Sequence, residues 1–259
     1  MRKIFVAVFL FAAVIFAGCG GGNQQSKVII GIDDEFAPMS FHNEQNELVG
    51  FDIDLAQEAM NRLGVAAEFK PIDWSNKEKE ITSGSIDLIW NGLDITNERK
   101  EYMIFSKPYM EDRQIVLVKA DSDFDIHSEY DLEGKIVGTQ AGSTSDDYIN
   151  RNLKLKNSLA EYKSYTKFSE VVDALKKEEI EVLVCDELVA RYEMNTCPDQ
   201  LKIINIKIGI ITETGIGFRK DNVELRDRVQ DVFDEMIRDG TARKISVKWF
   251  QADLISAER

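Results

Sequence analysis

One short stretch, IWNGLDITNER at residues 89–99, combines an apolar run with side chains that could bind an ionic ligand. The apolar run ends at an Asn-Gly pair, and Asp94, Thr96 and Arg99 follow closely. Thr96 is predicted to cap the following helix. This places Arg99 in the first turn, beside backbone N–H groups that no helical hydrogen bond occupies. A guanidinium group next to free N–H groups is suited to binding a carboxylate.

Arg99 also has a simpler interpretation. As a surface residue of that helix it would pair with Glu98 or Glu101, which is the commoner situation for a charged side chain. Asp186 follows the apolar segment IEVLVC and precedes a helical segment. An Asp in front of a helix is typical of an N-cap, so the residues alone favour a capping role for Asp186.

From residue 27 onward, short apolar strands alternate with amphipathic helices. KVIIGI is a predicted strand, and FDIDLAQEAMNRLG places Leu55, Ala59 and Met60 on one helical face before it ends at Gly64. The second half repeats this alternation, with GKIVGTQ and IEVLVC as strands and FSEVVDALKKE as a helix. The pattern predicts two mixed α/β units with helices over their sheets. Ligand-facing loops at the strand ends then indicate a cleft between the units.

The N-terminus has the composition of a cleaved export signal. Arg2 and Lys3 precede an apolar run that is too short to span a bilayer comfortably. The sequence FAGC resembles the lipobox of bacterial lipoproteins, in which Cys19 becomes the lipid-modified first residue. We therefore expect a signal peptide at residues 1–18, and a lipidated Cys with a flexible tether at residues 19–26. An unmodified Cys beside an ordinary signal-peptidase site is the alternative.

The net charge limits the possible binding partners, and the cysteine spacing bears on whether a disulfide forms. The chain has a formal net charge of −14, which disfavours binding to nucleic acid and to anionic lipid headgroups. Cys185 and Cys197 are separated by DELVARYEMN, a predicted helix about 15 Å long at 1.5 Å per residue. Because a disulfide needs Cα atoms within about 7 Å, we expect two separate thiols.

Five segments resemble the signature segments of the polar amino-acid solute-binding proteins of bacterial ABC importers, and they occur in that family's order. They are IGIDDEFAPMSF, ELVGFDIDLAQEA, GSIDLIWNGLDITNERKEYMIFSKPYM, LEGKIVGTQAGST and NVELRDRVQDVFDEMIRDGTARKISVKWF. Each segment alone is a weak signal. The ordered set is specific, and it covers nearly all of residues 27–254.

The resemblance implies a type II periplasmic-binding-protein clamshell, with two lobes, mixed sheets flanked by helices, and two hinge crossovers. It places residues 27–118 and 214–259 in the first lobe and residues 119–213 in the second. The hinges would lie near LVKAD and ITETG. The two lobes would close on one amino acid.

The resemblance also assigns the two ionic ends of the ligand. Arg99 matches the residue that binds the α-carboxylate, helped by the backbone N–H groups of Asp94 and Thr144. Asp186 matches the carboxylate that receives the α-ammonium group, together with the carbonyl of Gly92. One position departs from the family pattern, because Asp94 stands where Thr or Ser is usual. A carboxylate there would bind the ammonium more strongly, or would fold onto Arg99 and compete with the ligand.

Further matches concern the ligand side chain. Phe36 and Trp74 match the positions that sandwich it, with core packing as the alternative role for both. Asp33 matches the acidic position that contacts its distal polar atoms, and Trp90, Asn91 and Gln140 complete the wall. An acidic pocket with aromatic faces favours a basic amino acid, while glutamine and cystine stay as alternatives.

The implied function is extracytoplasmic capture of a polar, preferably basic, L-amino acid and its delivery to an ABC permease. We expect a monomer that is anchored to the cell membrane through lipid on Cys19, with no cofactor, no metal and no nucleic-acid partner. One alternative is a dehydratase-like enzyme on the same fold, in which Asp33 and Asp186 would do acid–base work. A sensor that acts with a separate signalling partner is the other. The sequence has no metal, phosphate-loop or nucleophile motif that favours catalysis.

Overall fold

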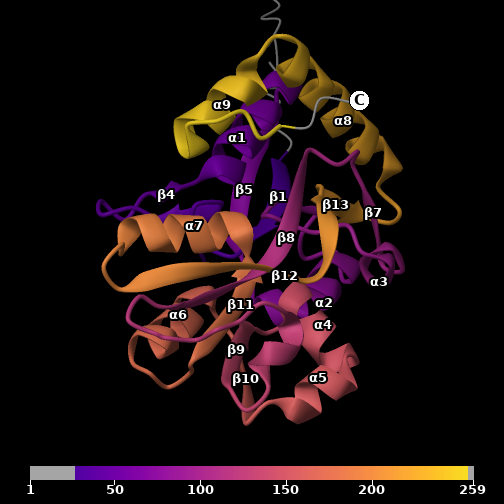
Figure 1. Cartoon of the computed structure of the whole chain (residues 1–259). Coiled ribbons are helices and arrows are strands. Elements are labelled where there is room, and N and C mark those ends of the chain that lie inside the picture. Colours follow the sequence, from indigo (N-terminus) through magenta and orange to yellow (C-terminus); the bar gives the residue numbers. More distant parts are fainter. Residues whose placement is uncertain (1–26, 256–259) are drawn as a thin grey trace, which may run out of the picture.

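The computed structural model of the chain describes residues 27–255 (Figure 1). The predicted signal peptide at residues 1–18, the lipidated Cys19 and the tether at residues 19–26 lie outside the described residues. Within the part of the chain that the structure describes, no helix is long and apolar enough to cross a membrane.

The first lobe is built on a five-stranded mixed sheet. β1 pairs in parallel with β5 and β6, whereas β13 runs antiparallel to β6 and β7. The strands, in sheet order, are β5 (Ala66–Pro71), β1 (Lys27–Ile32), β6 (Leu88–Ile89), β13 (Gly217–Arg219) and β7 (Met103–Phe105). A small antiparallel sheet beside it consists of β2 (Glu35–Phe36), β3 (Ser40–His42) and β4 (Leu48–Val49). Its helices are α1 (Phe51–Leu63), η1 (Trp74–Asn76), α2 (Lys77–Thr82), α3 (Asn97–Lys100), α8 (Val223–Arg238) and α9 (Thr241–Phe250).

The second lobe has its own five-stranded mixed sheet. β9 pairs in parallel with β10 and β11, and β8 runs antiparallel to β11 and β12. The strands, in sheet order, are β10 (Glu161–Tyr165), β9 (Ile136–Gln140), β11 (Val182–Asp186), β8 (Met110–Lys119) and β12 (Leu201–Thr214). Its helices are η2 (Glu129–Leu132), α4 (Thr144–Arg151), α5 (Leu153–Ser158), α6 (Phe168–Lys176) and α7 (Glu187–Thr196).

Helix periodicity explains how the first lobe closes over its sheet. α1 buries Leu55, Ala59 and Met60, as predicted, and ends at Gly64 in the left-handed conformation that glycine tolerates best. α8 places its apolar stripe against α1 and α9. Each fully buried large apolar side chain contributes roughly 1.5–3 kcal/mol. The same spacing that predicted these helices therefore also accounts for their packing.

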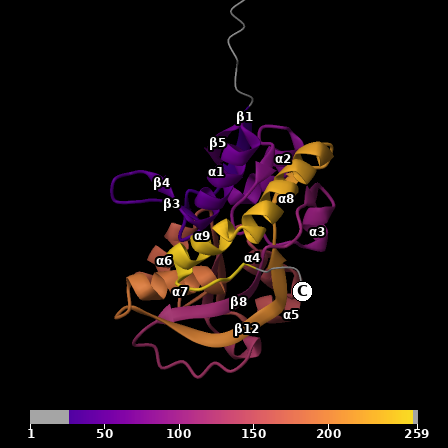
Figure 2. The same cartoon turned by 90° about the horizontal axis from the view of Figure 1, so that it is seen from above.

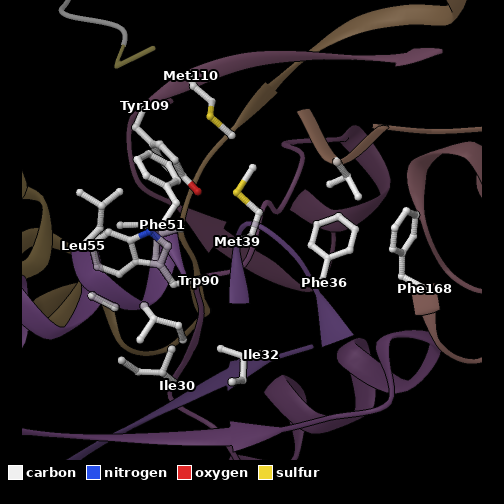
Figure 3. Packing of buried hydrophobic residues seen from close by; sticks show 14 of the residues in the cluster. Ile30, Ile32, Phe36, Met39, Phe51, Leu55, Trp90, Tyr109, Met110 and Phe168 are labelled. Atoms are coloured by element: carbon white, nitrogen blue, oxygen red, sulfur yellow. The ribbon is translucent and has the colours of Figure 1, made fainter. Parts of the chain in front are cut away.

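The apolar core continues from the first lobe to the second. Figure 3 shows Trp90 among the apolar side chains of the first lobe, and Phe36 facing Phe168 of α6. The Phe36 and Phe168 rings meet edge to face, with centroids 5.3 Å apart. This aromatic contact joins the two lobes beside the space between them.

Two neighbouring segments connect the lobes. The N–H of Tyr109 donates to the carbonyl of Thr214 at 2.9 Å, and from there β8 and β12 run side by side into the second sheet (Figure 2). β8 pairs within that sheet from Met110 onward. We therefore propose that the first crossing lies just before Met110, ahead of the boundary at residue 118 that the resemblance implied.

Candidate functional site

A cavity lies between the two lobes, with about 310 Å³ of space between its atoms when the open solvent at its mouth is included. Its lining consists of Asp33, Phe36, Trp74, Asn91, Gly92, Asp94, Arg99, Gln140, Ser143, Thr144 and Asp186. The structure thus brings together the residues predicted to contact a ligand, with the exception of Trp90, which is fully buried in the apolar core. It adds Ser143, the N-cap of α4. Their role in binding stays a prediction.

Arg99 is buried, with 3% of its surface exposed. Thr96 caps α3 as predicted and accepts a hydrogen bond from the Arg99 N–H at 3.2 Å. The guanidinium Nη1 donates to the carbonyl of Asp94 at 2.9 Å, and Nη2 donates to the carbonyl of Gly142 at 3.4 Å. Nε has no partner among the described residues. The interpretation of Arg99 as a surface residue is wrong, and its unused donor is available to a carboxylate.

The Asp94 carboxylate is buried and bridges the lobes. It accepts hydrogen bonds from the hydroxyls of Thr144 at 2.5 Å and Thr212 at 2.9 Å. Burial, followed by the charge of Asp186, raises the pKa of Asp94 to about 6, although Arg99 opposes this. Asp94 is therefore held by two hydroxyls and not folded onto the Arg99 fork.

Asp186 ends β11 and occupies the N-cap position of α7, but its side chain makes no capping hydrogen bond. The capping role that the residues alone favoured is therefore wrong. One carboxylate oxygen accepts a hydrogen bond from the side-chain amide of Gln114 at 2.5 Å. Burial raises the pKa of Asp186, and the hydrogen bond from Gln114 is among the effects that lower it.

Asp112 of β8 joins Asp94 and Asp186, and sequence analysis missed it. One oxygen atom from each of the three carboxylates lies within 4.8 Å of the other two. Burial raises the pKa of Asp112 well above its usual range, and the charges of the other two acids add to this. The three residues come from distant segments, so only the pairing of β8 with β11 could have revealed the cluster.

Asp33 lies at a different part of the cavity and contacts the second lobe. Its carboxylate accepts hydrogen bonds from the N–H of Glu35 at 3.0 Å and from the side-chain amide of Gln140 at 2.5 Å. Burial raises the pKa of Asp33. Asn91 holds the backbone here, because its Oδ1 accepts a hydrogen bond from the N–H of Asp33 at 2.7 Å, while its Nδ2 is buried without a partner among the described residues.

Phe36 and Trp74 supply the apolar walls, with 8% and 7% of their surfaces exposed. Gly92, between them and the acids, has a φ of +54°, and a Cβ there would lie 3.2 Å from the Phe36 ring. A residue other than glycine at this position would therefore be strained and would crowd the aromatic wall.

Asp52 holds the pocket loop from behind. It is fully buried, and its carboxylate accepts hydrogen bonds from the N–H of Gly92 at 2.6 Å and the hydroxyl of Tyr109 at 2.9 Å. Burial raises the pKa of Asp52 to about 7, against the opposing effect of these hydrogen bonds. Asp52 therefore ties the loop to the segment that leads out of the first lobe.

Lys77 is a second buried cation that sequence analysis missed. Its Nζ donates to the carbonyl of Gly142 in the second lobe at 2.6 Å and to the carbonyl of Trp74 at 3.2 Å. Burial, and then the charge of Arg99, lowers the pKa of Lys77 to about 7. Lysine is ordinarily an exposed residue, which is why a sequence pattern gives no signal here.

Residues 28–252 match the family model of the bacterial extracellular solute-binding proteins, family 3. The chain belongs to this family. The L-cystine-binding protein TcyJ of Escherichia coli strain K12 is 29% identical, and the match covers 89% of this chain and 85% of that protein. The histidine-binding periplasmic protein of the same strain is also 29% identical, with 98% and 99% covered.

Solved structures of this class have the same fold. A substrate-binding protein of an ABC uptake transporter from Streptococcus pneumoniae, with bound histidine, superimposes with a TM-score of 0.83 at 33% identity, covering 89% of this chain and 95% of that one. An ancestral arginine-binding protein bound to arginine gives 0.81 at 38% identity, covering 87% and 99%. The expected family and two-lobed fold are both confirmed.

Proposed function

We propose that this protein captures a polar L-amino acid between its two lobes, with a preference for a basic side chain, and delivers it to an ABC permease. The observation that carries the proposal is the pairing of Arg99 and Asp186 across one cavity. An amino acid carries a carboxylate and an ammonium group on one carbon atom. A site for it needs a cation and an anion fixed close together, and the buried guanidinium with its unused donor supplies the cation.

The preference for a basic side chain rests on Asp33 and on the aromatic walls. A distal ammonium or guanidinium group would replace part of the hydration that the buried Asp33 has lost, and it would gain from a cation–π contact with Trp74. The relatives are named for cystine, arginine and histidine, so basic and polar ligands both occur among them.

Contacts across the cavity support capture by closure. Asp94 binds Thr144, Asp33 binds Gln140, and Lys77 binds the Gly142 carbonyl, each from the first lobe to the second. Such contacts exist only when the lobes are together. A ligand that adds contacts to both lobes therefore shifts the equilibrium towards the closed form.

The family and the N-terminal sequence both support a proposal for the place of action. The family is described as extracellular. We propose that Cys19 carries the lipid that holds a monomer at the outer side of the cell membrane, with residues 20–26 as the tether. The permease would then recognise the closed lobes.

A thermal-shift panel tests the function. The chain from Gly20 onward retains both described sheets; it is unfolded and refolded to remove bound ligand, then mixed with the common amino acids, ornithine, citrulline and cystine. A ligand at about 1,000 times its Kd adds about 4 kcal/mol of stability, a shift near 10 °C. A shift with basic amino acids supports the whole proposal, and a shift only with glutamine or cystine refutes the basic preference. No shift with any amino acid contradicts the proposed class, and turnover of a bound acid would favour the dehydratase-like alternative.

A further inference from the structure

A buried carboxylate behind the cavity holds the ligand-facing loop of the second lobe. Asp146 lies in the first turn of α4, is 9% exposed, and is not among the residues that line the cavity. Its Oδ2 accepts a hydrogen bond from the N–H of Gly142 at 2.8 Å. Its Oδ1 accepts hydrogen bonds from the hydroxyl of Tyr162 at 2.5 Å and from the side-chain amide of Asn150 at 2.8 Å. The carboxylate therefore ties the loop before α4 to the body of the second lobe.

A capping role is the ordinary explanation for an acid at this position, but the geometry departs from it. In a capping box, the side chain of the third helical residue accepts a hydrogen bond from the backbone N–H of the N-cap. The N-cap here is Ser143, and its N–H donates instead to the carbonyl of Gln140 at 3.2 Å. The Asp146 carboxylate reaches one residue further, to Gly142. Its acceptor is thus used on the residue that contacts the first lobe.

Gly142 is held from both sides of the cavity. Its N–H bonds to Asp146 in its own lobe. Its carbonyl accepts hydrogen bonds from two cations of the first lobe, Lys77 at 2.6 Å and Arg99 at 3.4 Å. Glycine adopts positive and negative φ about equally readily, so the residue by itself does not fix the direction of its carbonyl. The bond to Asp146 supplies that constraint at the observed φ of +71°.

The first lobe fixes its own ligand-facing glycine in the same way. Asp52, like Asp146, lies in the first turn of a helix. It accepts hydrogen bonds from the N–H of Gly92 at 2.6 Å and from the hydroxyl of Tyr109 at 2.9 Å. Gly92 also has a positive φ and lines the cavity, and Gly142 directly precedes two lining residues. The repeated arrangement indicates that each acid serves the loop in front of its helix.

We propose that Asp146 is a positioning residue for ligand capture. It holds Gly142 so that the carbonyl reaches Lys77 and Arg99 when the lobes are together. The affinity for the ligand then depends on a carboxylate that lies outside the cavity lining. The inference rests on the proposed function, in which Arg99 binds the carboxylate of an amino acid. It adds a residue behind the cavity and a route from that residue to Arg99 across the lobes.

Charge alone is the competing explanation, since an acid near Lys77 can act on it through space. Burial lowers the pKa of Lys77, and the charges of Asp147 and, less strongly, of Asp146 oppose this effect. Among the described residues, the acid that accepts from the N–H of Gly142 is Asp146. Asp147→Asn therefore separates the two explanations, because it removes the stronger charge and leaves the hydrogen bond to Gly142.

Asp146→Asn removes the bond to Gly142 with little change in volume. The Asn oxygen can keep the donors of Tyr162 and Asn150, and its NH2 group then faces the N–H of Gly142, which cannot accept a hydrogen bond. Tyr162→Phe is the matched control, because it removes a donor to the same carboxylate and leaves the Gly142 bond. Both variants should lower the melting temperature. If Asp146→Asn does not fold, Asp146→Glu takes its place, since it keeps the charge and moves the carboxylate by one methylene group.

Calorimetry of the refolded protein with L-arginine, L-histidine, L-glutamine and L-cystine measures ligand affinity. Asp146→Asn should bind the ligand roughly 10-fold more weakly than the wild type, whereas Tyr162→Phe and Asp147→Asn should stay within about 3-fold. In a Lys77→Met background, Asp146→Asn should cost only about 3-fold, because the carbonyl has already lost its closer partner. A merely structural role for Asp146 would give the same loss in both backgrounds.

Lysine labelling with acetic anhydride gives a measurement that needs no ligand. Lys77 is 6% exposed, whereas Lys79 in the same helix is exposed. The ratio of their labelling rates, measured by mass spectrometry, therefore reports whether the second lobe covers Lys77. In the wild type, Tyr162→Phe and Asp147→Asn, Lys77 should be labelled more slowly than Lys79. In Asp146→Asn the two rates should approach each other.

Calorimetry decides the inference if any amino acid binds, and labelling decides it if none does. If an amino acid binds and Asp146→Asn matches Tyr162→Phe, or loses as much affinity in the Lys77→Met background, the inference is overturned while the proposed function stands. An equal or larger loss in Asp147→Asn assigns the effect to charge and also overturns the inference. Protection of Lys77 that only Asp146→Asn removes, without binding of any amino acid, supports the positioning role and overturns the proposed function. No binding and equal labelling in all variants overturn both.

Discussion

The Nζ of Lys77, in the first lobe, donates a 2.6 Å hydrogen bond to the carbonyl oxygen of Gly142, in the second. The same carbonyl accepts a longer bond from Arg99. Two cations of one lobe therefore converge on a single carbonyl of the other. Because this oxygen sits directly before the N-cap of α4, it fixes the pocket wall that carries Thr144.

Lys77→Met should weaken closure without unfolding the first lobe. Methionine keeps the apolar stem and removes the donor, so the closed form loses a charge-assisted hydrogen bond, and ligand affinity should fall roughly 10-fold. Small-angle scattering of the ligand-free protein and calorimetry of the ligand complex measure the two effects. Lys177→Met, at an exposed position, is the control. Unchanged affinity would show that the Gly142 contact plays no part in closure.

Gly142→Ala tests the same contact from the other side. The φ of Gly142 is +71°, and a Cβ there would lie 3.0 Å from both Lys77 Nζ and the Cα of Ser75 in the opposite lobe. Gly134 has a φ of +72° with no atom within 4 Å, so Gly134→Ala carries the same backbone strain of roughly 1–2 kcal/mol without the contact. Both variants should lose similar stability, but only Gly142→Ala should also lose ligand affinity. Equal affinities would contradict the inter-lobe role.

Arg99→Ala should reduce amino-acid affinity by roughly 100-fold or more while the protein stays folded, because it removes the fork for the carboxylate. Calorimetry measures the affinity, and circular dichroism the fold. Arg243→Ala removes an exposed arginine of α9 that pairs with Asp253 in the same lobe, and serves as a control for simple loss of charge. If Arg99→Ala kept its affinity for amino acids, Arg99 would not be the residue that binds the carboxylate.

Stability and affinity should respond to pH in opposite directions. Burial raises the pKa of Asp94 from 3.8 to about 6, and it raises the pKa of Asp112 well above its usual range. Between pH 3.8 and about 6 the folded protein holds a proton on Asp94 that the unfolded chain releases. The free energy of unfolding that this group contributes is therefore lost as the pH rises. Affinity for a cationic ligand should rise over the same interval, because the ionised carboxylates bind the ammonium. Urea unfolding and calorimetry at pH 5 and pH 7 measure both, and Asp94→Asn should reduce both slopes. If the free energy of unfolding and the ligand affinity changed in the same direction with pH, titration of these carboxylates would not explain the two effects.

Cys19→Ala should release the protein from membranes if lipid on Cys19 is the anchor. Cell fractionation shows the distribution of the protein, and the mass of the chain shows whether residues 1–18 have been removed. A cleaved Cys19→Ala protein that still sediments with membranes would contradict the lipid anchor.

Local pattern was enough to predict the helices and the cap near the cavity. The apolar spacing of α1 and the glycine at its end, and Thr96 at the start of α3, are consequences of short-range geometry. The motifs that match the family likewise predicted most of the residues that line the cavity. Such features depend on neighbours along the chain, or on segments that the family shares.

Asp112 and Lys77 could not be found in this way. Asp112 lies in an alternating strand where an acid would ordinarily face water, and it meets Asp186 only because β8 pairs with β11. Lys77 is buried by the approach of the second lobe, which its own segment does not encode. Our proposal that the first crossing lies just before Met110 rests on the same kind of contact, since strand pairing places Met110 in the second sheet.

The most direct test of amino-acid capture compares each amino acid with its decarboxylated counterpart. Refolded protein is titrated in a calorimeter with L-arginine and agmatine, and with L-histidine and histamine. Because Arg99 has no role for a ligand without a carboxylate, we predict that one amino acid binds per chain and that the matching amine binds at least ~100-fold more weakly. An amine that binds as tightly as its amino acid, or no binding by either amino acid or by glutamine and cystine, would contradict it.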